Sequence, residues 1–114
     1  PLIGVIINNY DAFYEVNTVI DEEIASLTRD GRRYGIFFII TANGDNSVRR
    51  RIKQNFSTIL ALRLNDESGY NSIFGKVNNP PREVPGRGLF KTDNIYEFQT
   101  AIITDNNDEV ICKC

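Results

Sequence analysis

The stretch Leu2-Ile3-Gly4-Val5-Ile6-Ile7-Asn8-Asn9 is a continuous apolar run that ends in two side-chain amides. A run of this kind, rich in β-branched residues, is typical of a central strand of a parallel sheet with both faces covered. The run from Ile36 to Ile40 has the same character. Between the two runs, apolar residues recur at the three- and four-residue spacing of a helix: Phe13, Val16, Ile20, Ile24 and Leu27. Strand, helix and strand in this order predict a βαβ unit.

The rest of the chain continues the alternation of helices and strands. A short helix is expected with Val48, Ile52 and Phe56 on one face, after a loop in which Asp45, Asn46 or Ser47 acts as the cap. A third strand is predicted over 59–62, and a short helix that ends at Phe74. Residues 86–90 and 95–99 flank a polar turn and predict a β-hairpin. We interpret residues 105–108 as a linker.

Composition indicates one compact globular domain. The chain has 114 residues, a formal net charge of −2 and 25% charged residues, so its overall charge does not favour nucleic acid. It contains no histidine, which removes the commonest general base and metal ligand. Its two cysteines, Cys112 and Cys114, are too few for a structural zinc site, and we expect no metal centre. No apolar run reaches the length needed to span a bilayer.

Four motifs, in order, resemble the FtsK/SpoIIIE group of P-loop ATPases, and most closely the EssC/EccC-type ATPases of type VII secretion. The segment from Arg29 to Ile36 is similar to the group's R-x-G-R-x-x-G-I stretch, and Ile40-Thr41-Ala42-Asn43 to the end of the following strand. The segment from Pro85 to Phe90 resembles its P-G-R-G turn, and Tyr96 to Ala101 the Y-x-F-Q ending of the secretion members.

This resemblance implies a RecA-like α/β fold: a three-layer sandwich with a mostly parallel sheet, without its N-terminal Walker A part, that ends in the β-hairpin. Residues 1–104 are then part of one ATPase-type module, and residues 105–114 are a linker or tail. The module is expected on the cytoplasmic side of a bacterial membrane, in a membrane-anchored secretion motor. The partners that the resemblance implies are adjacent modules of the same parent chain, small helical WXG-type substrates and further copies in a hexamer.

Two departures from the group concern ATP and magnesium, which its members use. No Gly-Lys-Ser or Gly-Lys-Thr occurs, so the phosphate-binding Walker A loop is absent. Asn8 and Asn9 stand where the Walker B strand ends in carboxylates, and neutral amides are poor ligands for a hard cation. Asp11 is not expected to substitute for them. We therefore assign no catalytic residue and expect no tight nucleotide binding and no autonomous ATP hydrolysis.

Further candidate residues each have two interpretations. Asn8, Asn9 and Asn43 form a degenerate nucleotide site, or are polar residues that end strands and start turns. In one interpretation, Arg32 contacts the nucleotide of a neighbouring subunit. In the other, its charge balances the negative C-terminal end of a helix. Phe74, Leu89 and Phe90 frame a substrate groove, or belong to the core.

The basic residues define the alternative function. A basic cluster is formed by Arg49, Arg50, Arg51 and Lys53. If the chain is part of a DNA-translocating FtsK/SpoIIIE motor, this cluster contacts DNA phosphates. If it is not, the cluster is a solvated surface. We consider nucleic acid the less favoured partner because the net charge is negative. A third interpretation is an interaction module that has lost its nucleotide site and contributes to assembly.

Overall fold

The computed structural model describes residues 1–102. Its elements follow in the order β1 (Ile3–Ile7), α1 (Tyr10–Val16), α2 (Asp21–Asp30), the 3-10 helix η1 (Gly31–Tyr34), β2 (Ile36–Ile40), α3 (Arg50–Lys53), β3 (Ile59–Ala61), α4 (Glu67–Phe74), β4 (Arg87–Lys91) and β5 (Ile95–Gln99). The expected tail at residues 105–114 lies outside the described residues. None of the described helices is long and apolar enough to cross a membrane.

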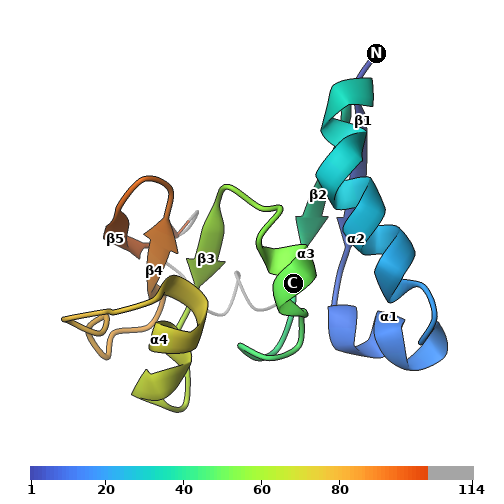
Figure 1. The fold of residues 1–114 in the computed structure, drawn as a ribbon. Helices are drawn as coiled ribbons and strands as arrows, with labels where there is room; N and C mark the ends of the chain where they lie inside the picture. The colour runs from blue at the N-terminus through green and yellow to red at the C-terminus, as the bar shows by residue number, and fades with distance from the viewer. Residues whose placement is uncertain (103–114) are drawn as a thin grey trace.

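The strands form two sheets (Figure 1). β1 and β2 pair in parallel, with Ile3 opposite Ile36 and Ile7 opposite Ile40. β3, β4 and β5 form an antiparallel sheet in that order. The α/β class, the βαβ unit and the C-terminal hairpin are thus confirmed. Within residues 1–102, however, the strands do not form a single, mostly parallel sheet, because β3 pairs only with β4 and no described strand joins β2 to β3.

Each sheet has its own core on one face. Tyr10, Ile24 and Ile52 pack on the β1–β2 sheet, where Ile7 is also buried. In the second core, Tyr70 and Phe74 of α4 pack against Ala61 and Leu89 of the antiparallel sheet. Because side chains alternate along a strand, the opposite faces are apolar but open to solvent, and Ile6 is 71% exposed and Leu60 64% exposed. The described residues therefore form a sheet layer and a helix layer on one of its faces. The third layer of the expected three-layer sandwich is not among them.

Two local expectations need correction. The predicted single helix is divided into α1 and α2, because the backbone N–H of Asn17 caps α1 by donating to the carbonyls of Phe13 and Tyr14. Val16 consequently lies at the end of α1, exposed rather than in the core. The short helix α3 begins after Arg49, which has no side-chain capping bond, and not after Asp45, Asn46 or Ser47.

Candidate functional site

Polar side chains gather where the parallel strands β1 and β2 end. The Thr41 hydroxyl donates to Asn8 Oδ1 over 2.7 Å and accepts the backbone N–H of Asn9 over 2.9 Å. The side-chain amide of Asn43 donates to Asn9 Oδ1 over 3.3 Å. The structure therefore brings Asn8, Asn9 and Asn43 together as expected. The Thr41 hydroxyl connects Asn8 to Asn9 in this cluster. The sequence did not indicate this role for Thr41.

Asn9 has an unusual backbone conformation. Its φ of 61° lies in the left-handed region, and it is the only described residue other than glycine with a positive φ. Its side-chain oxygen accepts the backbone N–H of Ala12 over 3.4 Å, so Asn9 is also the cap of α1. Asparagine is among the few residues that tolerate this conformation, because its short side chain bonds to the nearby backbone. The bend directs the chain from β1 into α1.

Asp11 is the one carboxylate of this cluster, and it is already engaged. Its Oδ2 accepts the backbone N–H of Asn43 over 3.2 Å. A hydrogen bond from Ser47, followed by the bond from Asn43, lowers the pKa of the Asp11 carboxyl below its ordinary value. The charged form is thus favoured, but its contacts hold the loop after β2 against α1.

These residues do not fit a magnesium-bound nucleotide. The amide oxygens of Asn8 and Asn9 accept hydrogen bonds from within the cluster, and amides bind Mg²⁺ less well than carboxylates. No group of three or more acidic, histidine or cysteine residues that could hold a metal occurs in the described part of the chain. A degenerate nucleotide site at these residues stays a prediction.

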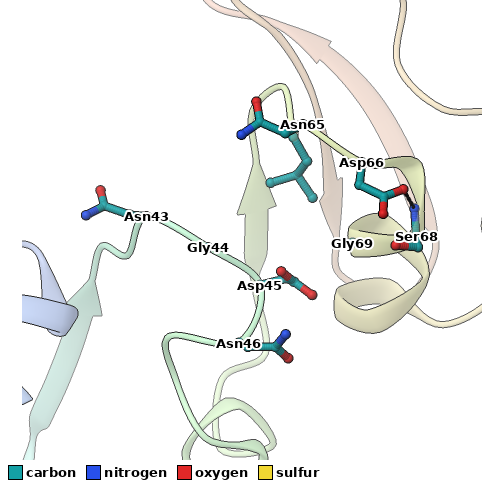
Figure 2. Close-up of a pocket in the computed structure, with 9 residues that line it drawn as sticks. Asn43, Gly44, Asp45, Asn46, Asn65, Asp66, Ser68 and Gly69 are labelled. Atoms are coloured by element: carbon teal, nitrogen blue, oxygen red, sulfur yellow. Dashed lines mark hydrogen bonds between the residues drawn. The ribbon is translucent and has the colours of Figure 1, made fainter.

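A hollow of about 320 Å³ lies beside the cluster, between the loop after β2 and the start of α4 (Figure 2). Ligands of open α/β sheets commonly bind at such a place, beyond the carboxyl ends of the strands. Two carboxylates contribute to its lining, and Oδ1 of one of them, Asp66, accepts the backbone N–H of Ser68. Its lining residues are Asn43, Gly44, Asp45, Asn46, Leu64, Asn65, Asp66, Ser68 and Gly69. Because none of them is cationic, the hollow suits hydroxyl or ammonium groups better than phosphates.

Arg32 is not part of this site. It lies in η1, which precedes β2, whereas Asn43 follows β2, so the two residues are at opposite ends of the strand. Its side chain is exposed. A role at a neighbouring subunit's nucleotide therefore remains a proposal.

The expected substrate groove is divided by the antiparallel sheet. Phe74 and Leu89 are each 3% exposed and pack together in the core under α4. In this structure they are core residues and do not line a groove. Phe90 points to the opposite face, where its ring stacks on Tyr96 at a centroid distance of 5.2 Å and meets Phe98 edge-on at 6.1 Å.

A buried charge cluster was not anticipated from the sequence. Asp21 is 3% exposed, and its carboxylate accepts a short hydrogen bond from the Tyr10 hydroxyl. Arg49 and Arg51 reach the same carboxylate, with Nε of Arg49 at 3.2 Å from its Oδ2. Burial, and then the bond to Asp21, raise the pKa of the Tyr10 phenol above its ordinary value. Two members of the basic cluster are thus paired internally, which weakens the case for DNA contact.

Comparison with known proteins shows which proteins this chain is similar to. No family model matches the chain. The ESX secretion system protein YukB of Bacillus subtilis (strain 168) is 30% identical over 110 residues, which are 96% of this chain. The chain is similar to a short part of this protein. It spans about 7% of the length of the curated EssC/EccC relatives it matches.

Solved EssC/EccC structures agree with the fold. A structure described as EssC (ATPases 2 and 3) from Geobacillus thermodenitrificans superimposes with a TM-score of 0.86 at 29% identity, covering 99% of this chain and 22% of that one. Thermomonospora curvata EccC (ATPases 2 and 3) in complex with a signal sequence peptide gives a TM-score of 0.66 at 29% identity. That match covers 87% of this chain and 18% of the EccC chain. The chain is therefore similar to part of an EssC/EccC ATPase region.

Proposed function

We propose that this chain is part of a cytoplasmic ATPase-type module of a membrane-anchored type VII secretion motor. In this role it contributes to substrate recognition or to contact with adjacent modules, and does not hydrolyse ATP by itself. The observation that carries the proposal is the superposition of nearly the whole chain on EssC (ATPases 2 and 3). The internal pairing of Arg49 and Arg51 favours this role over the alternative of a DNA-translocating motor.

The nucleotide part of the proposal depends on the cluster at the ends of β1 and β2. Asn8 and Asn9 carry no charge to balance magnesium, and their oxygens take part in hydrogen bonds that fix the start of α1. The chain also has no Walker A sequence to bind phosphates. We assign to Asn8, Asn9 and Asn43 the structural task of joining β1, α1 and the loop after β2.

The isolated chain should not bind ATP. Calorimetric titration with ATP and magnesium is expected to show no saturable heat at micromolar protein concentration. The matched control is the double variant Asn8→Asp, Asn9→Asp, which restores two carboxylates and should still fail to bind, because the phosphate loop is absent. Magnesium-dependent binding of ATP by the unmodified chain at low micromolar affinity would contradict the proposal.

The substrate part of the proposal concerns the open face of the antiparallel sheet. Phe90, Tyr96 and Phe98 alternate outward from β4 and β5, and Leu60 lies opposite Phe90 on β3. Gly88 leaves room for the neighbouring ring, since a Cβ atom at that position would lie 2.8 Å from the Phe98 ring. The result is a flat apolar surface, which we name the aromatic face: Leu60, Phe90, Tyr96 and Phe98. Such a surface suits the apolar side of a short helix.

Tyr96 is the ring of the aromatic face best suited to a binding test, because it is 44% exposed whereas Phe90 and Phe98 are partly buried. We expect Tyr96→Ala to weaken binding of a C-terminal signal peptide from a cognate WXG-type substrate by about 1–3 kcal/mol, the usual contribution of an aromatic anchor. Fluorescence anisotropy with the labelled peptide measures this loss. Val19→Ala, on the exposed turn before α2, is the control and should leave the affinity unchanged.

The outcomes separate the two parts of the proposal. If the chain does not bind the peptide while another module of the same parent does, the chain has a structural or regulatory role. If a duplex DNA oligonucleotide is retained in a gel at moderate salt while the peptide is not, the DNA-translocating alternative is correct, because phosphate-driven binding of that strength requires free cations.

A further inference from the structure

Asp21 is the one charged residue that is buried in the described part of the chain. It is the first residue of α2, and its partners come from elsewhere: Tyr10 from α1, and Arg49 and Arg51 from the start of α3. A buried carboxylate needs its partners, because an uncompensated charge inside a protein is costly. The carboxylate therefore holds both arginines close to α1 and α2.

Arg49 is restrained by a second residue as well. Its Nη2 donates to the Tyr14 hydroxyl over 2.7 Å, and its guanidinium lies 5.4 Å from the centroid of the Tyr14 ring. A planar guanidinium that is bonded at its edge and stacked on its face has little freedom to rotate. These contacts connect the Arg49 side chain to α1.

The segment between β2 and α3 has no helix or strand of its own. Its beginning is attached to α1, since the backbone N–H of Tyr10 donates to the Thr41 carbonyl over 2.9 Å and Asn43 binds Asp11. Its middle makes a turn between Gly44 and Ser47. Arg49 and Arg51 attach its end to Asp21. The middle is attached too, because Lys53 Nζ donates to the Asp45 carbonyl over 2.9 Å, so the Asp21 contacts secure chiefly the end of the segment.

We infer that Asp21 is a positioning residue: through Arg49 and Arg51 it fixes the end of the loop 41–49, whose residues 43–46 form one wall of the hollow in Figure 2. The side chain of Asp21 itself is not among the residues that line the hollow. The inference holds whatever the site binds.

Hydrogen–deuterium exchange of the full 114-residue chain, read by mass spectrometry, tests this inference. Asp21→Asn keeps the shape of the side chain and removes its charge. We expect amides in the loop 41–49 to exchange about 10-fold faster or more, while those of the β4–β5 hairpin keep their rate. Arg49→Gln should reproduce the pattern, because it removes the same ion pair from the exposed side. The matched control is Asp30→Asn, which removes an acid paired with Arg29 and Arg33 at the surface and should leave the loop unchanged.

Two results would overturn the inference. In the first, the loop 41–49 exchanges at its original rate in both Asp21→Asn and Arg49→Gln. In the second, exchange rises equally in the loop, in α2 and in the hairpin, which indicates that Asp21 supports the whole fold and not the loop. If Asp21→Asn does not fold, Arg49→Gln alone decides, because the Arg49 side chain is half-exposed and its loss leaves the core intact.

Discussion

Replacement of Tyr10 by alanine should remove about 3–5 kcal/mol from the free energy of unfolding, as large-to-small changes of buried aromatic residues do. Tyr10 is 1% exposed at the centre of the first core, where its ring packs beside Phe13 and Tyr14. The change also removes the hydroxyl that donates to the buried Asp21. A small domain has only about 5–15 kcal/mol of stability, so the variant should lose a large share of it.

Urea unfolding followed by circular dichroism measures this effect. Tyr10→Phe separates the two contributions, since it keeps the ring and should cost about 1.5–3 kcal/mol for the lost hydrogen bond to the charged Asp21 carboxylate. Tyr34→Ala is the control, because Tyr34 is 73% exposed and its loss should change the unfolding free energy by less than about 0.5 kcal/mol. A loss below about 1 kcal/mol for Tyr10→Ala would show that the first core does not depend on this residue.

A dimer that covers the open apolar faces should be more stable than the separate chains by on the order of 5 kcal/mol. The open apolar faces supply this difference: Ile6, Phe37, Ile39 and Leu60 are each about half-exposed or more. β2 and β3 also have unpaired edges in the described structure, and open edges of this kind bind other chains. A second copy that covers both features buries the apolar side chains.

Dilution tests this expectation. The isolated chain should self-associate through its open strands, so its melting temperature should fall on dilution and its sedimentation should change with concentration. The expectation fails if the isolated chain is a cooperative monomer whose melting temperature does not change on dilution.

The sequence predicted those parts of the fold that depend on local pattern. The strand at Ile36 to Ile40 was expected at the residues where it is found, because an uninterrupted β-branched and aromatic run bounded by polar residues suits few other structures. The hairpin was expected because a polar turn separates residues 86–90 from residues 95–99. The division between α1 and α2 was not expected, since the helical spacing continues across Asn17, where a backbone bond to Phe13 ends the first helix.

The site could be predicted only where its residues follow strands. Asn8, Asn9 and Asn43 end neighbouring parallel strands, and this placement is sufficient to bring them together. Asp21 could not be found in this way, because its partners Arg49 and Arg51 lie about 30 residues further along the chain. An acidic residue at the start of a helix ordinarily indicates a favourable charge near the helix dipole, and nothing in the pattern shows that it is buried.

The left-handed backbone at Asn9 has an evolutionary consequence. Aspartate tolerates the same φ and caps a helix by the same hydrogen bond, so position 9 can exchange amide for carboxylate without a change in the chain's path. Each asparagine codon differs from an aspartate codon by a single base. The exchange is therefore one point mutation away in either direction, and descendants of this protein can gain or lose an acidic residue at the end of β1 while the framework around it stays the same.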